Sequence, residues 1–229
     1  MRLSDSARRS VKGGGLPMDN ITRRQNEMAY IADSACCEQV LEARKKYWKY
    51  NNTEPWLVDE LAAQIRAIFG STGKSCTVVP PFRCDYGFNT HVGENFYANY
   101  NLTVLDVARV DIGDNVFIAP NVTISTAGHP IHPQARNTAY EYGVAVSIGS
   151  DCWIGAGVTV CPSVHIGRGT VIGAGSVVTR DIPEGVVAAG NPCRVIRAIT
   201  DEDKQYYFKR RKFDEDAMRA VESYGQEGI

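Results

Sequence analysis

The sequence predicts a mainly β protein: a parallel β-helix of hexapeptide repeats, with a small helical cap before it and a helix after it. The main observation is an aliphatic residue at every sixth position from 148 to 178, usually followed by glycine. Six helical residues turn through about 600°, so no helix keeps these side chains on one face. Six is a multiple of the strand period of two, so each hexapeptide predicts one short strand of a solenoid. The aliphatic positions are Ile148, Ile154, Val160, Ile166, Ile172 and Val178.

The composition limits the class of protein. With 229 residues and 44% hydrophobic content, the chain is expected to form one domain, or one domain with an appendage. A net charge of −1 without blocks of like charge argues against nucleic-acid and membrane binding, and no apolar run reaches the ~20 residues that span a bilayer. Seven cysteines without a C-x-x-C pair or a secretory signal predict reduced thiols and a cytoplasmic location. For the adjacent Cys36 and Cys37, helix packing, metal binding and redox sensing stay open.

The N-terminal part of the chain divides into a leader and a helical cap. Residues 1–17 are polar, contain three successive glycines, and are expected to be a disordered leader. Residues 18–74 are expected to form the cap, with helical stretches TRRQNEMAYIAD, EQVLEARKKYWKY and WLVDELAAQIRAIFG. In the last stretch, apolar residues recur at helical spacing, with Thr53 as the predicted N-cap and Gly70 as the stop.

The β-helix is expected over residues 75–198, with an interrupting loop at 125–147. Before the loop, aliphatic or alanine residues again recur every six positions. The exception is a step of eight from Val104 to Ile112, which predicts a two-residue bulge. The loop holds two of only four histidines. A regular solenoid that interrupts itself in this way is expected to carry a functional loop or a partner contact.

The tail, residues 199–229, predicts a C-terminal helix. Thr200 is the expected N-cap and Asp203 stands in the capping-box position. Acids come early and bases later, as the helix dipole prefers. Such a helix would cover the exposed strand edges at the end of the solenoid.

Three stretches carry a resemblance to a known family. The loop contains AGHP at 127–130, an earlier coil reads NFYANYNLT at 95–103, and the solenoid ends in GNPCRVIR at 190–197. Together with the hexapeptides, they resemble the galactoside/maltose O-acetyltransferase family over about residues 25–213. The resemblance implies a left-handed β-helix, a homotrimer with sites between subunits, and acetyl-CoA as co-substrate. The left hand follows from the resemblance alone, because crossovers are usually right-handed.

Acetyl transfer to a hydroxyl needs a base, a hydrogen-bond donor for the oxyanion and a binding site for the cofactor. His129 matches the family's catalytic histidine, and an imidazole titrates near neutral pH, as a base here must. Asn99 matches a residue that touches acceptor and thioester, although it could also be a turn-forming asparagine at a coil corner. Glu141 aligns beside the histidine, where it would orient the imidazole, bind the sugar, or be a solvated carboxylate. By position, the backbone N–H of Ala156 is the expected oxyanion donor.

The resemblance also implies the binding residues. At the cofactor positions, small residues let the pantetheine arm lie against the coil and arginines pair with phosphates. These positions are Asn99, Trp153, Ala156, Ala174, Thr179, Arg180, Arg194 and Arg197. The acceptor positions are mostly carboxylates, which accept from sugar hydroxyls; they are Asp33, Asp85, Tyr97 and Asp106. Asp85 and Val107 favour the maltose-type branch, whereas KQYYFKRRKF at 204–213 resembles the galactoside type, so the sugar stays open.

The implied reaction is direct transfer of acetyl to a hydroxyl, at the 6-position of a sugar such as a galactoside, maltose or glucose. Alternatives stay open: an antibiotic or other small acceptor, or a non-catalytic β-helix scaffold. A third alternative is a zinc hydratase of the γ-carbonic anhydrase type, which needs three histidines around the metal. The four histidines, at 91, 129, 132 and 165, lack that family's placement, so no metal is expected.

Overall fold

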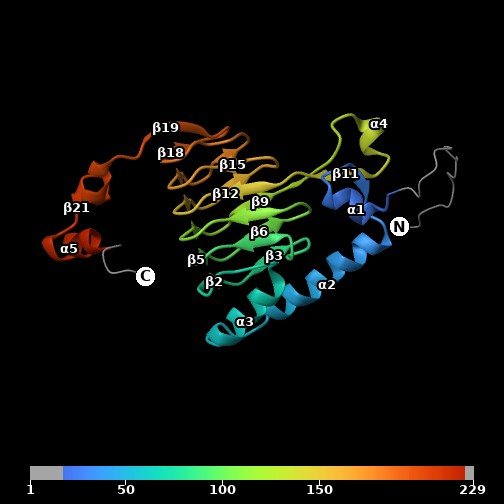
Figure 1. Cartoon of the computed structure of the whole chain (residues 1–229), viewed down its shortest axis with the longest axis horizontal. Helices are drawn as coiled ribbons and strands as arrows, with labels where there is room; N and C mark the ends of the chain where they lie inside the picture. Colours follow the sequence, from blue (N-terminus) through green and yellow to red (C-terminus); the bar gives the residue numbers. More distant parts are fainter. Residues whose placement is uncertain (1–17, 225–229) are drawn as a thin grey trace.

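The computed structural model describes residues 18–224, which form a stack of triangular β-coils flanked by helices (Figure 1). The first face of the stack holds β2 (Cys76–Val78), β5 (Phe96–Ala98), β8 (Phe117–Ile118), β13 (Trp153–Ile154), β16 (Val171–Ile172), β18 (Val186–Ala189) and the antiparallel β19 (Arg194–Ala198). The second face holds β3 (Phe82–Cys84), β6 (Leu102–Leu105), β9 (Thr123–Ser125), β14 (Thr159–Val160) and β17 (Val177–Val178). The third holds β4 (Thr90–Val92), β7 (Val110–Ile112), β12 (Val146–Ile148) and β15 (His165–Ile166). Up to β18, each strand pairs in parallel with the strand one coil away.

The period-six residues form the core, as predicted. Ile118, Ile154 and Ile172 are direct partners on successive coils, and each is fully buried. Burying one such side chain contributes about 1.5–3 kcal/mol, so the stacked aliphatic rows hold the coils together. The eight-residue step after Val104 is also present: Asp106, Val107 and Ala108 are buried in a bulge before β7.

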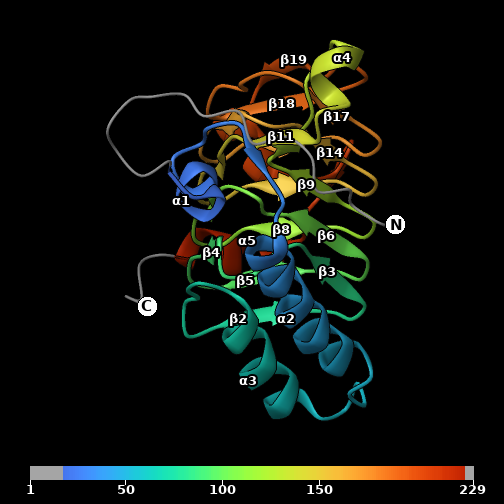
Figure 2. The ribbon, with the colours of Figure 1, turned by 90° about the vertical axis from the view of Figure 1, so that its right-hand side faces the viewer.

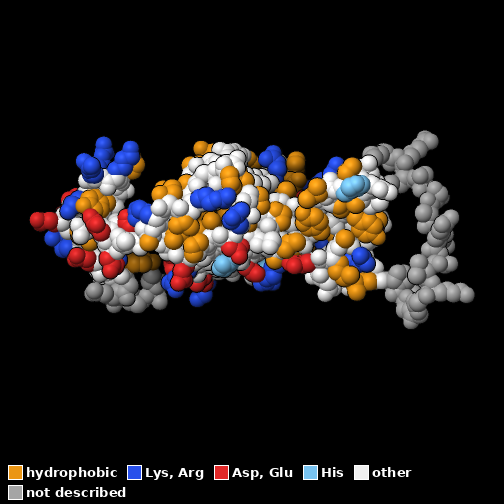
Figure 3. Space-filling view, turned by 90° about the horizontal axis from the view of Figure 1, so that it is seen from above, with side chains coloured by type: hydrophobic (Ala, Val, Ile, Leu, Met, Phe, Trp, Pro, Cys, Tyr) orange, Lys and Arg blue, Asp and Glu red, His pale blue; other side chains and the backbone are white. Residues whose placement is uncertain are grey.

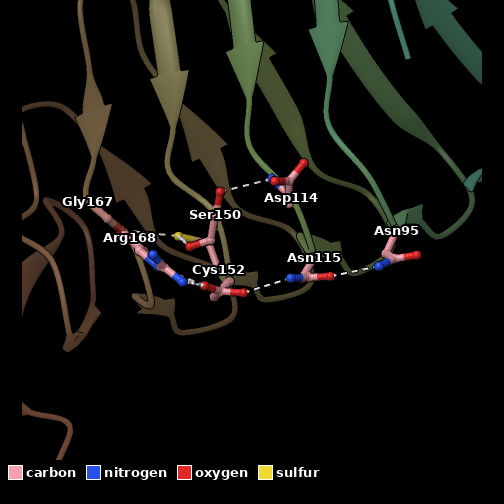
Figure 4. Close-up of polar contacts among 8 residues, drawn as sticks. Asn95, Asp114, Asn115, Ser150, Cys152, Gly167 and Arg168 are labelled. Atoms are coloured by element: carbon pink, nitrogen blue, oxygen red, sulfur yellow. Dashed lines mark hydrogen bonds and ion pairs between the residues drawn. The ribbon is translucent and has the colours of Figure 1, made fainter. Parts of the chain in front are cut away.

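The corner between the third and first faces is held by a side-chain ladder (Figure 4). Asn95, Asn115 and Asp151 occupy the left-handed backbone region, with φ of 54°, 55° and 63°, a region that asparagine and aspartate tolerate. Asn95 Nδ2 donates to Asn115 Oδ1 (2.9 Å), and Asn115 Nδ2 donates to Asp151 Oδ1 (3.0 Å). Arg168 Nε continues the row with a 2.8 Å bond to Asp151 Oδ2. These bonds therefore join the same corner of successive coils.

The N-terminal cap is helical, although its first stretch is shorter than predicted. It contains α1 (Asn20–Gln25), β1 (Tyr30–Ile31), α2 (Ser34–Asn51) and α3 (Val58–Ile68). The predicted N-cap of the last helix is wrong: Leu57 stands there without a side-chain bond, and Thr53 Oγ1 donates to the Lys49 carbonyl instead. Helices α2 and α3 cover the end of the stack at β2 and β3 (Figures 1 and 2). The buried Tyr50 hydroxyl donates to the Val78 carbonyl across that contact.

The tail departs from the single predicted helix. Its elements are a 3₁₀ helix η1 (Asp201–Gln205), β20 (Tyr206–Phe208), β21 (Arg211–Lys212) and α5 (Glu215–Ser223). The capping box of Thr200 and Asp203 exists but opens only η1. Aromatic residues in β20 favour a strand, and Lys209, at φ 51°, makes the hairpin turn. We call residues 199–224 the C-terminal arm; it stands beside the stack rather than over its end (Figure 1).

The expected leader, 1–17, lies outside the described residues, as does the end of the expected C-terminal segment, 225–229. Among the described residues, none of the helices is both long enough and apolar enough to cross a membrane.

Candidate active site

The interrupting loop is folded by strand pairing with the N-terminal cap. It contains β10 (Ala127–Gly128), α4 (Pro133–Arg136) and β11 (Tyr140–Gly143). Strand β11 pairs antiparallel with β10 on one side and with β1 on the other, which sets Tyr30 opposite Glu141. Glu27 Oε1 also accepts from the Ala145 N–H at 2.9 Å. His129 directly follows β10, so its backbone is fixed by this small sheet.

One contact seats the loop on the coil, and a second holds the tip of the loop. A Cβ at Gly143 would lie 2.7 Å from Val107 Cγ1 and 2.9 Å from the Ala108 nitrogen, so β11 lies against the bulge of the preceding coil. At the tip, Arg136 Nη1 donates to the Pro130 and Ile131 carbonyls at 3.1 and 2.8 Å. The segment after His129 is thereby held in a turn.

His129 and Glu141 lie side by side. His129 Nδ1 is 4.0 Å from Glu141 Oε2, longer than a hydrogen bond, and the imidazole side chain is 59% exposed while the carboxylate is 26% exposed. A small movement of the ring would form the bond and leave Nε2 pointing away from Glu141. Burial first, and the neighbouring Glu141 second, raise the pKa of Tyr30 well above its usual range, so this phenol stays protonated.

Two cavities meet at this pair. The Asp85 cavity, about 380 Å³, is lined by His129 and Glu141 together with Asp85, Arg44 and Tyr86. Its remaining lining is Tyr30, Ala32, Cys36, Cys37, Val40, Leu105, Val107 and Ala127. The Arg136 cavity, about 420 Å³, is lined by His129, Glu141, Arg136, Ile31, Ala32 and Ala139. The histidine and glutamate are therefore accessible from both sides.

The charges of the Asp85 cavity act on one another. Burial raises the pKa of Asp85, the charge of Glu141 raises it further, and the Arg44 guanidinium opposes both. Within the described chain, Arg44 forms no salt bridge, so its donors are free to face the cavity. Two carboxylates and one guanidinium suit a ligand with several hydroxyl groups, because they supply acceptors and donors together.

Asp106, expected at the acceptor, does not reach the cavity. Its side chain is fully buried: Oδ1 accepts from the Asp85 and Tyr86 N–H groups at 3.2 and 2.9 Å, and Oδ2 accepts from Thr90 Oγ1 at 3.1 Å. Burial raises the pKa of Asp106 to about 6. In this structure, the Asp106 carboxylate supports the turn that carries Asp85.

Asp33 also lies outside both cavities. Its carboxylate is the N-cap of α2 and accepts from the Cys36 N–H (3.1 Å) and from Asn20 Nδ2 (3.0 Å). These bonds lower the pKa of Asp33. The bonds join α1 to α2, so in this chain Asp33 holds the cap together.

The expected cofactor residues fall into two groups. In the first, Ala156 and Ala174 stack on successive coils at the corner between the first and second faces, where the Gly175 N–H donates to the Ala156 carbonyl (2.8 Å). Asn99 opens the same corner two coils earlier, and its Oδ1 accepts from the Tyr100 N–H at 2.8 Å. These small residues leave the corner open to an extended ligand.

The first face beside this corner carries the aromatic and basic members. Tyr97, Phe117 and Trp153 are in register, and the last two are 55% and 56% exposed. Arg194 and Arg197 are three positions apart, which in a regular strand would turn them to opposite faces. A register shift in β19 places both opposite outward-facing residues of β18. Both arginines therefore point out from the face that carries Trp153.

The second group lies at the corner from which the loop departs. Thr179 and Arg180 follow β17, which belongs to the same face as β9, and both are exposed. Within one chain, the cavities bring together His129, Glu141 and Asp85. Of the other expected site residues, none lines either cavity: Asn99, Tyr97, Trp153, Ala156, Ala174, Thr179, Arg180, Arg194, Arg197, Asp33 and Asp106.

Arg44 and Tyr86 line the Asp85 cavity but were not expected there. The signal for Arg44 was available in α2, because Cys37, Val40 and Arg44 recur at spacings of three and four and so share one helix face. The two cysteines of α2 differ: Cys36 is buried and Cys37 exposed.

The histidines do not gather around a metal position. His91 Nδ1 shares a 2.9 Å hydrogen bond with Ser71 Oγ, and His165 Nδ1 shares a 2.7 Å bond with Ser147 Oγ, both on the third face. His132 accepts from the Gln134 N–H as the N-cap of α4. Over residues 18–224, no three His, Cys, Asp or Glu side chains come together in a group able to hold a metal ion.

A parallel β-coil with a histidine and a carboxylate on an interrupting loop defines the class of hexapeptide-repeat acyltransferases. A family model described as bacterial transferase hexapeptide (six repeats) matches residues 145–180. The galactoside O-acetyltransferase of Escherichia coli (strain K12) is 48% identical over 177 residues, which cover 77% of this chain and 87% of that protein.

Solved structures of two acetyltransferases have a similar fold. A maltose O-acetyltransferase from Clostridium difficile 630 superposes with a TM-score of 0.79 at 47% identity, covering 80% of this chain and 99% of that one. A galactoside acetyltransferase in complex with coenzyme A superposes with a TM-score of 0.83 at 44% identity, covering 86% and 99%. The chain belongs to the galactoside/maltose O-acetyltransferase family. The predicted left-handed β-helix and acetyltransferase class are confirmed.

Proposed function

We propose that the protein transfers acetyl from acetyl-CoA directly to the 6-hydroxyl of a sugar such as a galactoside, maltose or glucose. The observation that carries this proposal is the Asp85 cavity, where His129 and Glu141 face a further carboxylate and a guanidinium in about 380 Å³. The relative solved with coenzyme A supports acetyl-CoA as the donor. Relatives named for galactoside and for maltose support a sugar acceptor.

In this mechanism, His129 Nδ1–H donates to Glu141 and Nε2 removes the proton of the acceptor hydroxyl. The hydroxyl oxygen attacks the carbonyl carbon of the thioester. The tetrahedral intermediate then collapses as its carbon–sulfur bond breaks. The coenzyme A thiolate leaves and takes the proton from His129. The 4.0 Å separation of His129 and Glu141 closes when substrate excludes water, as catalytic hydrogen bonds often tighten only in the complex. General base catalysis of this kind contributes about 10²–10⁴ in rate.

The acceptor is held on the opposite wall. Asp85 accepts from ring hydroxyls and Arg44 donates to ring oxygens, which orients a neutral sugar. A 6-hydroxyl stands off the pyranose ring by one carbon, so it reaches His129 while the ring hydroxyls stay at Asp85. Asp106 supports this wall through its bonds to the turn of Asp85.

The complete site forms between copies in a homotrimer. His129 lies at one corner of the coil, whereas Asn99 and the Ala156 N–H, the proposed oxyanion donors, lie at another. A neighbouring copy would bring its Asn99 corner and outward arginines to the His129 loop. Preorganised donors at a developing oxyanion each contribute about 10²–10³ in kcat.

Thiol release from acetyl-CoA over a panel of sugars tests this function. His129→Ala is expected to lower kcat by about 10²–10⁴. The matched control is His132→Ala, three residues on in the same loop and outside both cavities, expected to stay within about twofold. Turnover unaffected by His129→Ala, or no turnover with any sugar, contradicts the proposal.

A further inference from the structure

The C-terminal arm carries cations that no acid of the described chain neutralises. The hairpin β20–β21 contains four successive basic residues, Lys209, Arg210, Arg211 and Lys212. Over residues 18–224, none of the four forms a salt bridge. Basic side chains accordingly gather on the arm at the left of Figure 3.

A cavity of about 630 Å³ separates this hairpin from the end of β19. Its cationic lining is Arg197, Lys209 and Arg210, and its other lining is Ala198, Thr200, Glu202, Asp203 and Tyr206. Glu202 is the one lining acid that bonds to no cation in the described chain, because Asp203 is paired with Arg197. Within the described residues, the lining therefore contains two unpaired cations, Lys209 and Arg210, and one unpaired acid, Glu202.

Arg197 is held so that one edge of its guanidinium stays available. Nη1 donates to Asp203 Oδ2 (2.8 Å) and to the Ala198 carbonyl (2.9 Å), and Nη2 donates to Asp203 Oδ1 (2.7 Å). Asp203 is itself fixed by the Thr200 N–H at 2.8 Å. A guanidinium has five N–H donors, so the Nε–H and the second Nη2–H remain, both on one edge. That edge matches the spacing of two phosphate oxygens.

Arg197 also joins this cavity to the proposed cofactor groove. It points out from the same face as Arg194 and Trp153, while its far side meets the arm. The charge of the arm does not extend into a continuous basic surface, since Asp214, Glu215 and Asp216 follow it directly. A compact phosphoester fits this arrangement better than a polyanion, which needs a longer basic track.

We propose that the cavity between β19 and the C-terminal arm binds the 3′-phosphate of acetyl-CoA, with Arg197, Lys209 and Arg210 as its donors. This rests on the proposed function and extends the cofactor site onto the arm. Asp203 acts as a positioning residue, because its two bonds hold the Arg197 guanidinium, which lines the cavity. The hairpin then discriminates coenzyme A from its analogue without the 3′-phosphate.

Calorimetric titration with coenzyme A and with 3′-dephospho-coenzyme A tests this site without any acceptor. The wild type is expected to bind coenzyme A about tenfold more tightly, as charge-assisted bonds to a phosphate allow. Lys209→Ala/Arg210→Ala should lose most of that preference and keep its affinity for the dephospho analogue, which also shows that it is folded. The control is Lys212→Ala on the same hairpin, whose ammonium donates to Gln205 Oε1 and does not line the cavity; it should keep the preference.

Asp203→Asn adds a second measurement, because it weakens the fork that orients Arg197 and should lower the preference by a few-fold. Equal affinities of the wild type for both compounds overturn the site, as does a double variant that discriminates like the wild type. If thiol release still depends on His129 in that case, the proposed function stands and only the phosphate site is wrong. Absence of any coenzyme A binding overturns both proposals.

Discussion

Asp106 offers the sharpest perturbation of the fold around the site. Its carboxylate accepts from the Asp85 N–H, the Tyr86 N–H and Thr90 Oγ1, all in a fully buried position. Asp106→Ala leaves the Tyr86 N–H and Thr90 Oγ1 unpaired, whereas the Asp85 N–H keeps its 3.2 Å bond to the Val104 carbonyl. Each buried unpaired group costs about 1–3 kcal/mol. For two such groups we expect a loss of about 2–6 kcal/mol in the free energy of unfolding, measured by urea unfolding followed through tryptophan fluorescence.

Asp106→Asn is the matched variant, because it preserves the shape and the bonds. Its Oδ1 can accept from the two N–H groups, and its Nδ2 can donate to Thr90 Oγ1. We expect this variant to cost less than about 1 kcal/mol at neutral pH. A loss for Asp106→Asn as large as for Asp106→Ala would show that the carboxylate charge, rather than the hydrogen bonds, stabilises the turn.

The two side chains should also differ in their pH dependence. The pKa of Asp106 is about 6 in the folded chain, against an ordinary value of 3.8 for an aspartate carboxyl, so the folded state binds more protons between these values. The stabilisation that protonated Asp106 supplies is therefore present below pH 4 and is lost as the pH rises to 6. Relative to Asp106→Asn, the wild type should lose about 2–3 kcal/mol of stability from pH 4 to 7. Parallel profiles at matched protein concentration would refute this reasoning.

Two further predictions concern the loop. Glu141→Gln should lower kcat for thiol release about tenfold, with little change in the KM for acetyl-CoA, because it weakens the orientation of the His129 ring; a change confined to the KM of the sugar would instead make Glu141 a binding residue. Gly143→Ala should lower kcat and the melting temperature together, because its Cβ would meet Val107 Cγ1 at 2.7 Å and the Ala108 nitrogen at 2.9 Å. Unchanged kinetics in Gly143→Ala would show that the loop can shift without moving His129.

The β-helix could be predicted because its determinants are local. An aliphatic residue such as Ile154 points inward by strand alternation, and its partners Ile118 and Ile172 repeat the same spacing on the next coils. The eight-residue step after Val104 likewise predicts the bulge. The same alternation, continued from Leu102 and Val104, predicts that Asp106 points inward. Its side chain is fully buried, as this alternation predicts.

The rest depended on contacts between distant segments. Arg44 joins Asp85 only because α2 packs beside the coil, and β1 forms only because Tyr30 pairs with Glu141. In the tail, the Thr200 capping box is a valid helix start, but the aromatic run that follows favours a hairpin. Local signals therefore located His129 and its loop, whereas the walls of its cavity required the folded chain.

The proposed site between copies can be tested directly. His129→Ala and Asn99→Ala should each abolish most thiol release alone, since each removes one half of every site. When the two variants are co-expressed and assemble together, sites that combine an intact His129 with an intact Asn99 of a neighbour should restore about a quarter of wild-type activity. Restoration to that level supports acetyl transfer at a shared His129 site. Mixed assemblies that stay as inactive as either variant would place both residues in one chain and contradict the account.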